Sequence, residues 1–276
     1  MDLLQSIFLG FLQGLTEFLP ISSSAHILIF PALFGWEDPG AAFTAVIQLG
    51  TEAAVLIYFR KDLWQIGSTW MASLRRPELR SDLNARMGWY LIAATIPIAI
   101  LGFLFQDQIE TAARNLWLVG SMLIVFGIVL GLADRVGSRS RTVGDLSVRD
   151  GILIGLAQSL ALVPGVSRSG STISASLFLG LQRADAARFS FLLAIPAVVL
   201  SGFFQLYKIL AGKEAVGEPL INVAVATLVS FIVGYAVIAW FLNYLTRNSF
   251  ALFVGYRLVL GTGVLVLLSA GLISSQ

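Results

Sequence analysis

The sequence predicts an all-α polytopic membrane protein built from two halves that have opposite orientations in the bilayer. Three observations lead to this fold class. Of the 276 residues, 57% are hydrophobic and only 12% are charged, with a mean hydropathy of +0.84, which is far from the composition of soluble domains. The apolar residues form long segments, two of which are interrupted by polar runs. The basic residues gather mainly in two connecting loops.

Six apolar segments approach the ~20 residues that a spanning helix requires. They lie at roughly 41–59, 88–106, 116–133, 187–210, 220–242 and 251–273. Two further apolar regions, about 3–35 and 151–182, are interrupted by Pro20 to Ser24 and by Pro164 to Thr172. We expect each to be a re-entrant pair of half-helices, giving four half-helices in all. Irregular backbone at membrane depth needs protein or a polar cavity around it, so both interruptions should line one internal site.

Two basic loops set the predicted orientation. The positive-inside rule makes both loops cytoplasmic. Two spans separate the loops, and an even number of spans places both loops on the same side of the membrane. The first interrupted region then enters from the non-cytoplasmic side and the second from the cytoplasmic side. We therefore expect a single integral membrane domain over residues 1–276, with repeat halves at about 1–134 and 150–276. The loops contain Arg60, Lys61, Arg75, Arg76, Arg80 and Arg86 in the first, and Arg135, Arg139, Arg141 and Arg149 in the second.

A weak internal repeat supports the two halves. The run Gly14 to Glu17 resembles Gly155 to Gln158, and each is followed by leucine, proline and a serine cluster. Beyond the prolines, Ser23 aligns with Ser169. Inverted repeats with broken helices that meet near the pseudo-symmetry axis are typical of transporters. Chance similarity between apolar stretches is the competing explanation.

Charge and cysteine content exclude several functions. The net charge is only +2, and the basic residues form loops rather than a patch, so no nucleic acid partner is expected. The chain has no cysteine, which excludes disulfides, thiolate metal sites and a cysteine nucleophile.

The run from Pro164 to Thr172 has the composition of a phosphate site. Arg168 offers a planar fork of donors that matches phosphate oxygens. Gly165 and Gly170 allow backbone N–H groups to come close, and hydroxyls complete the shell. The predicted phosphate-binding residues are Ser22, Ser24, Gly165, Ser167, Ser169, Gly170 and Thr172.

The first interruption carries the groups that hydrolysis needs. Gln13 and Glu17 lie four residues apart, on one face of a short helix. Serines 22–24 follow, and His26 is the single histidine of the protein. These residues supply a base or metal ligand, a nucleophile and a proton carrier, while Arg168 stabilises charge as a P–O bond breaks. The predicted catalytic residues are Glu17, Ser23, His26 and Arg168.

Three other polar residues in the apolar segments are secondary candidates. Ionisable groups at membrane depth are costly and usually functional. For Glu52 and Arg257, a structural ion pair or a contact with the cavity is as good an interpretation as catalysis. Gln48, one turn before Glu52, contacts the same cavity or holds a helix break.

The two polar runs closely resemble the motifs of the undecaprenyl-diphosphate phosphatases, the bacitracin-resistance family of bacterial membranes. The resemblance covers essentially the whole chain and departs at Ser24 and Ala25, where many members have threonine and glycine. It implies hydrolysis of undecaprenyl diphosphate to undecaprenyl phosphate and inorganic phosphate, which recycles the lipid carrier for peptidoglycan and other envelope polymers and confers bacitracin resistance.

The resemblance also implies a cofactor, partners and a location. The cofactor would be a divalent cation, Mg²⁺ or Ca²⁺, with Glu17 and Gln13 as ligands. Bacitracin would compete for the substrate. The protein would be a multi-pass protein of the bacterial plasma (inner) membrane, with the cavity open to the outer, periplasmic side. The small-residue face from Gly120 to Gly131 could pack within the chain or form a homodimer.

The residues leave the nucleophile open. Either Ser23 attacks the terminal phosphorus or positions the attacking water, with Glu17 as base and His26 as acid or base, or His26 itself attacks. A different class is also open, namely an inverted-repeat transporter or flippase for a phosphorylated lipid or small anion. The set of Glu17, Ser23 and His26 favours the enzyme, because transport does not need it.

Overall fold

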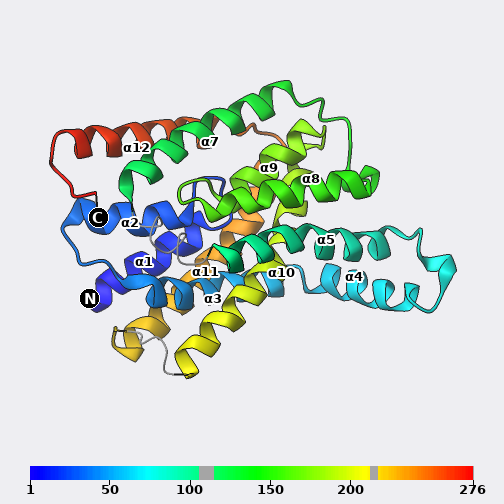
Figure 1. Ribbon diagram of the computed structural model, residues 1–276, viewed down its shortest axis with the longest axis horizontal. Helices are drawn as coiled ribbons and strands as arrows, with labels where there is room; N and C mark the ends of the chain where they lie inside the picture. The colour runs from blue at the N-terminus through cyan, green and yellow to red at the C-terminus, as the bar shows by residue number, and fades with distance from the viewer. Residues whose placement is uncertain (106–114, 212–216, 276) are drawn as a thin grey trace.

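The chain is helical throughout the part that its computed structural model describes, residues 1–105, 115–211 and 217–275 (Figure 1). Within these ranges no strand forms, and the one sheet-like pairing is an isolated bridge between Arg141 and Leu181. The all-α prediction is therefore confirmed. The predicted connection from Asp107 to Arg114 lies outside the described residues.

Twelve of the helical elements build the molecule. They are α1 (Leu3–Thr16), α2 (Ser23–Phe34), α3 (Gly40–Tyr58), α4 (Arg60–Ser73), α5 (Leu83–Leu104), α7 (Leu116–Val136), α8 (Val148–Ser159), the short 3₁₀ helix η3 (Leu160–Leu162), α9 (Arg168–Phe178), α10 (Arg183–Leu210), α11 (Leu220–Tyr244) and α12 (Ala251–Ser269). Two further 3₁₀ turns, Pro77–Leu79 and Val143–Asp145, lie in the connections.

Both predicted interruptions break their helices. The chain leaves α1 at Thr16 and starts α2 at Ser23, and it leaves η3 at Leu162 and starts α9 at Arg168. The residue before each second half-helix has a left-handed backbone, with φ of 72° at Ser22 and 74° at Ser167. Such backbone is costly for a residue with a Cβ atom and concentrates at functional sites.

The long apolar segments form helices of membrane length. By length and composition α5, α7, α11 and α12 can cross a bilayer, and the bent pair of α3 and α4 is a fifth candidate. The chain is thus a multi-pass membrane protein.

The first basic loop is more ordered than predicted. It contains α4, which follows α3 after a bend of 71°, and the next helix, α5, runs back beside α4 (Figure 1). Trp70 of α4 packs against Gly88 of α5, where a Cβ would lie 2.7 Å from the indole Cγ. The prediction of a plain loop was wrong because Arg60, Lys61 and Asp62 hide the helix from a search for apolar runs.

Glycines bring α1 and α3 against the same helix, α11. A Cβ on Gly14 would lie 2.7 Å from the carbonyl oxygen of Ser230, and one on Gly50 would lie 2.2 Å from that of Thr227. Small residues allow this close approach of backbones in a membrane protein. The approach fixes α1 and α3 on the two sides of α11.

The glycine face of α7 packs within the chain. A Cβ on Gly120 would meet Leu265, one on Gly127 would meet Arg257, and one on Gly131 would meet Val254, all on α12. The two helices lie side by side along one edge of the molecule (Figure 1). This face is therefore already covered by the protein's own last helix.

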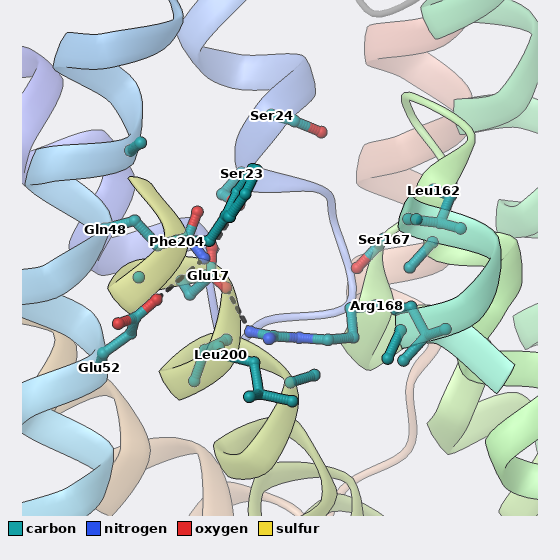
Figure 2. A pocket seen from close by; sticks show the side chains of 18 of the residues that line it. Glu17, Ser23, Ser24, Gln48, Glu52, Leu162, Ser167, Arg168, Leu200 and Phe204 are labelled. Atoms are coloured by element: carbon teal, nitrogen blue, oxygen red, sulfur yellow. Dashed lines mark hydrogen bonds and ion pairs between the residues drawn. The ribbon is translucent and has the colours of Figure 1, made fainter. Parts of the chain in front are cut away.

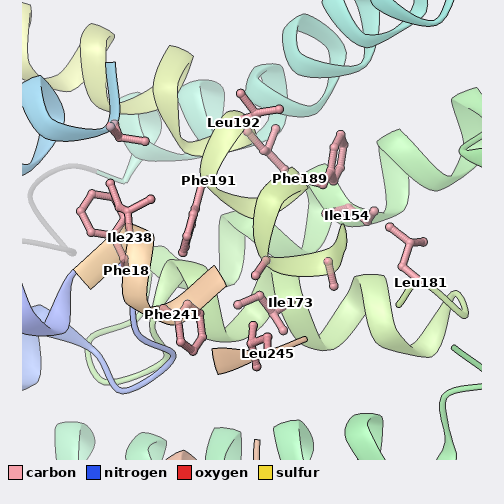
Figure 3. Close-up of a cluster of buried hydrophobic side chains, with 14 of the residues drawn as sticks. Phe18, Ile154, Ile173, Leu181, Phe189, Phe191, Leu192, Ile238, Phe241 and Leu245 are labelled. Atoms are coloured by element: carbon pink, nitrogen blue, oxygen red, sulfur yellow. The ribbon is translucent and has the colours of Figure 1, made fainter. Parts of the chain in front are cut away.

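An aromatic core holds the first break in place. Phe18 packs edge-on against Phe191 of α10 at 5.3 Å between ring centroids, and Phe191 lies 6.0 Å from Phe241 of α11. Figure 3 shows these rings with Ile173, Leu181 and other buried side chains between α9, α10 and α11. Because Phe18 is buried, the backbone of its neighbour Glu17 is fixed.

Candidate active site

A cavity of about 670 Å³ is lined by both broken regions (Figure 2). This agrees with the expectation that the two interruptions share one site. The apolar part of its wall comes mainly from α5, η3 and α10. The polar part consists of Glu17, Ser22, Ser23, Ser24, Gln48, Glu52, Ser167, Arg168 and Lys208.

Glu17 is the centre of the hydrogen-bond network. Its Oε2 accepts a hydrogen bond from the Ser23 hydroxyl at 2.5 Å and one from the Gln13 amide at 3.0 Å. Its Oε1 forms an ion pair with Arg168 Nη2 at 2.5 Å. Charge-assisted hydrogen bonds of this kind are short and strong. The carboxylate thus aligns a hydroxyl from the first break with a guanidinium from the second.

The two breaks have matching geometry but different chemistry. Ser22 and Ser167 both precede a half-helix with positive φ, and each has its hydroxyl 3.1 Å from that of the serine two residues later. By this geometry Ser22 corresponds to Ser167, and Ser24 corresponds to Ser169. This local match differs by one residue from the sequence alignment of Ser23 with Ser169. In the structural match Ser23 corresponds to Arg168, so one half offers a hydroxyl where the other offers a cation.

Several predicted phosphate-binding residues lie behind the cavity wall. Ser22, Ser24 and Ser167 line the cavity. Ser169 donates to the carbonyl oxygen of Leu19 at 2.9 Å, which joins the two breaks. The hydroxyl of Thr172 lies 2.6 Å from that of Ser190, inside the protein.

The two predicted glycines also support the wall from behind. Gly165 has a φ of 87°, and a Cβ there would lie 2.6 Å from the carbonyl oxygen of Val119. The amide of Gly170 donates to the Ser167 hydroxyl at 3.1 Å. Both glycines thus shape the second break without lining the cavity.

Arg257 is fully buried and joins the two breaks. Its guanidinium donates to carbonyl oxygens of Pro20 in the first break, at 3.0 Å, and of Gly165 and Val166 in the second, at 2.8 and 3.2 Å. Further bonds reach Met122 and Leu123 on α7. Among the described residues it has no carboxylate partner and does not line the cavity. Both sequence interpretations of Arg257, an ion pair and a cavity contact, were wrong.

His26 lies beneath the cavity rather than in its wall. The side chain is 1% exposed. Its Nδ1 lies 2.7 Å from the carbonyl oxygen of Ser22 and its Nε2 lies 2.6 Å from the Tyr256 hydroxyl. Since a carbonyl only accepts, Nδ1 carries the proton and Nε2 accepts from Tyr256. The imidazole lone pair is therefore occupied. Nothing in the sequence around Tyr256 pointed to this partner.

Gln48 and Glu52 of α3 face the same cavity. The Gln48 amide lies 3.4 Å from Glu52 Oε1, and Figure 2 shows this pair on one side of Glu17, with Arg168 on the other. Glu52 thus has the cavity contact that the sequence left open. Lys208 of α10 was missed, because one lysine near the end of an apolar segment resembles an ordinary interfacial residue.

These features define a polytopic helical membrane protein in which an internal cavity combines a carboxylate, a hydroxyl and a guanidinium from two broken helical hairpins. Comparison with known proteins agrees with this class. The chain belongs to the bacitracin resistance protein BacA family, whose family model matches residues 6–263.

Relatives that match the chain over nearly its full length are named for the same enzyme activity. A protein of Nocardioides sp. named undecaprenyl-diphosphatase is 57% identical, with 99% of both chains covered. One of Mycolicibacterium smegmatis with the same name is 55% identical over the whole of both chains. One of Streptomyces avermitilis named undecaprenyl-diphosphatase 2 is 50% identical, covering 99% of this chain and 97% of its own. The chain therefore matches these relatives from end to end.

Proposed function

We propose that this protein hydrolyses undecaprenyl diphosphate to undecaprenyl phosphate and inorganic phosphate. It would recycle the lipid carrier of peptidoglycan and other envelope polymers and contribute to bacitracin resistance. The observation that carries the proposal is the bridge at Glu17, which holds the Ser23 hydroxyl and the Arg168 guanidinium on one carboxylate. A base, a nucleophile and a cation for the phosphate are thus assembled in one cavity.

The geometry favours Ser23 as the nucleophile. Its oxygen attacks the terminal phosphorus and its proton passes to Glu17, which already accepts it at 2.5 Å. The anhydride P–O bond breaks, and Glu17 gives the proton to the leaving prenyl phosphate. Water then attacks the phosphoserine, and its proton returns through Glu17 to the Ser23 oxygen as phosphate leaves. Arg168 stabilises the charge on the transferring group.

His26 would act by position rather than by attack. Its two ring nitrogens are engaged by Ser22 and Tyr256, and it does not line the cavity. The Nδ1 bond to the Ser22 carbonyl supports the left-handed backbone just before Ser23. We propose that this contact fixes the direction of the Ser23 hydroxyl.

The apolar part of the cavity suits a prenyl chain. Its lining includes Gly102 and Phe103 of α5, Leu162 of η3, and Leu200 and Phe204 of α10. Phe103, Leu200 and Phe204 are also exposed on the outer surface of the helices. The tail would leave sideways between α5 and α10 into the lipid.

We further propose six spans, α3, α5, α7, α10, α11 and α12, and four half-helices, α1, α2, α8 and α9, as two inverted repeats. The matched backbone at Ser22 and Ser167 supports the repeat. The basic residues between α3 and α5 and between α7 and α8 favour a cytoplasmic side there. The protein would lie in the plasma (inner) membrane with the cavity open to the outer, periplasmic face.

The cofactor and partners implied by the family are also proposals. A divalent cation, Mg²⁺ or Ca²⁺, would neutralise phosphate charge when bound. Bacitracin would compete for the substrate. A homodimer stays a prediction, although the glycine face of α7 that suggested it is covered by α12.

Release of inorganic phosphate tests the proposed function. Purified protein in detergent should release phosphate from undecaprenyl diphosphate, whereas the Glu17→Ala and Arg168→Ala variants should release little. Equal release by all three proteins would remove the enzyme proposal and leave the lipid transporter as the better interpretation.

A further inference from the structure

The cavity contains two glutamine–glutamate pairs that have the same spacing and the same design. Gln13-Gly-Leu-Thr-Glu17 at the end of α1 recurs as Gln48-Leu-Gly-Thr-Glu52 on α3. In each pair the amide donates to the carboxylate, at 3.0 Å in the first and 3.4 Å in the second. The glycine of each pair packs on α11 near Ser230. The two carboxylates therefore line one cavity from two neighbouring helices.

The two carboxylates differ in their partners. Glu17 is neutralised by Arg168 and also accepts from Ser23 and Gln13. Glu52 is 7% exposed, and the Gln48 amide at 3.4 Å is longer than an ordinary hydrogen bond. In the described part of the chain no basic group forms an ion pair with Glu52. A buried charge without an ion-pair partner is costly, so this carboxylate, unpaired among the described residues, is suited to an added cation.

The charge of the proposed substrate also indicates that the cavity needs an added cation. The cavity lining has two carboxylates, Glu17 and Glu52, against two cationic side chains, Arg168 and Lys208. Their charges cancel, whereas a diphosphate brings several negative charges. Holding such an anion beside Glu52 requires additional positive charge.

We propose that Glu52, together with the amide oxygen of Gln48, binds a divalent cation that enters with the diphosphate. This inference rests on the proposed function. Carboxylate and amide oxygens are suitable ligands for Mg²⁺ or Ca²⁺. No group of three His, Cys, Asp or Glu that could hold a metal was found among the described residues, so phosphate oxygens and water would complete the shell, as is usual for Mg²⁺. The pair of Gln13 and Glu17 is less suited, because Arg168, Ser23 and Gln13 already occupy both Glu17 oxygens.

Binding of Mn²⁺, followed by electron paramagnetic resonance of the free ion, tests this site without catalysis. Purified protein is titrated with Mn²⁺ alone and with Mn²⁺ plus a prenyl methylenediphosphonate, which cannot be hydrolysed. Wild type should bind Mn²⁺ more tightly with the analogue present. Glu52→Gln should weaken that binding by about tenfold or more, whereas the exposed control Glu37→Gln should not change it.

A second variant moves the carboxylate without removing it. A Cβ on Gly202 of α10 would lie 2.7 Å from Glu52 Oε2, so Gly202→Ala should displace Glu52 and also weaken Mn²⁺ binding. The unfolding midpoint of Glu52→Gln should equal or exceed that of wild type, because the substitution removes an uncompensated buried charge. A lower midpoint would count against the proposal.

Three binding results would overturn the proposed site. In the first, wild-type protein does not bind Mn²⁺ in the presence of the analogue. In the second, Glu52→Gln binds Mn²⁺ as tightly as wild type does. In the third, Glu17→Gln loses Mn²⁺ binding while Glu52→Gln retains it. Phosphate release by wild type and its loss in Ser23→Ala report the proposed function separately. A failed cation site would therefore leave the phosphatase proposal standing.

Discussion

Arg168 Nη2 lies 2.5 Å from Glu17 Oε1, although the two residues are 151 positions apart in the chain. Arg168 belongs to the second broken hairpin, and Glu17 belongs to the first. The same carboxylate accepts a hydrogen bond from the Ser23 hydroxyl at 2.5 Å. The ion pair therefore joins the two broken regions at the point where the proposed chemistry takes place.

Removing the guanidinium should abolish most activity. In Arg168→Ala the transferring phosphoryl group loses its stabilising cation and Glu17 loses its counter-ion, so kcat should fall by about 10²–10³-fold. Arg168→Lys should be intermediate, because a lysine gives a point charge without the planar fork. Phosphate release measures the effect, and the exposed Arg247→Ala is the matched control. Wild-type activity in Arg168→Ala would contradict the proposed role.

Ser23→Ala should abolish the phosphorylated intermediate. The protein is mixed with substrate labelled in its terminal phosphate, quenched in acid and examined for bound label. Wild type should carry acid-stable label, as expected of phosphoserine, and Ser23→Ala none. Ser68→Ala on α4 is the control, because this serine is exposed and does not line the cavity. Label that acid removes would point to His26 instead.

Tyr256→Phe should reduce activity without abolishing it. The change removes the hydroxyl that donates to His26 Nε2, but the Nδ1 bond to Ser22 remains. Loss of one neutral hydrogen bond corresponds to about 1 kcal/mol, or roughly a fivefold lower kcat/KM. Steady-state phosphate release checks this. A loss as large as that of Ser23→Ala would show that the tyrosine does more than hold the imidazole.

Arg257→Met should destabilise the protein strongly. The substitution leaves buried carbonyl groups of both breaks and of α7 without a donor, and each unsatisfied group is costly. The free energy of unfolding should fall by about 3 kcal/mol or more. Denaturant unfolding in detergent measures it, with the exposed Arg247→Met expected within about 0.5 kcal/mol of wild type. An equally stable Arg257→Met would mean that the breaks are held by other contacts.

Gly50→Ala should separate α3 from α11. The added Cβ would lie 2.2 Å from the Thr227 carbonyl oxygen, which is backbone and cannot move alone. The expected loss is about 1–3 kcal/mol of stability, with reduced Mn²⁺ binding because Glu52 shifts. Gly263→Ala in α12, where a Cβ meets nothing within 4 Å, is the control and should not lower the unfolding midpoint.

The helical membrane class, the two breaks and the chemical groups they carry all follow from the amino-acid sequence. Long apolar segments require helices in a bilayer whatever their partners are. Pro20, Pro164 and the serine runs interrupt those helices locally, which is why Glu17, Ser23 and Arg168 were identified without coordinates. The helix α4 was missed because it begins with the charged residues Arg60, Lys61 and Asp62 and is not an apolar run.

Which of the polar groups contact one another depends on the tertiary structure. In the folded protein His26 contacts Tyr256 and lies away from the cavity. Arg257 donates to carbonyl groups of both breaks rather than to a carboxylate of the described residues. Glu52 lies in the cavity wall, and no basic group of the described residues forms an ion pair with it. These outcomes depend on how glycines let α1 and α3 approach α11, and contacts between residues far apart in the chain leave no periodic signal in the sequence.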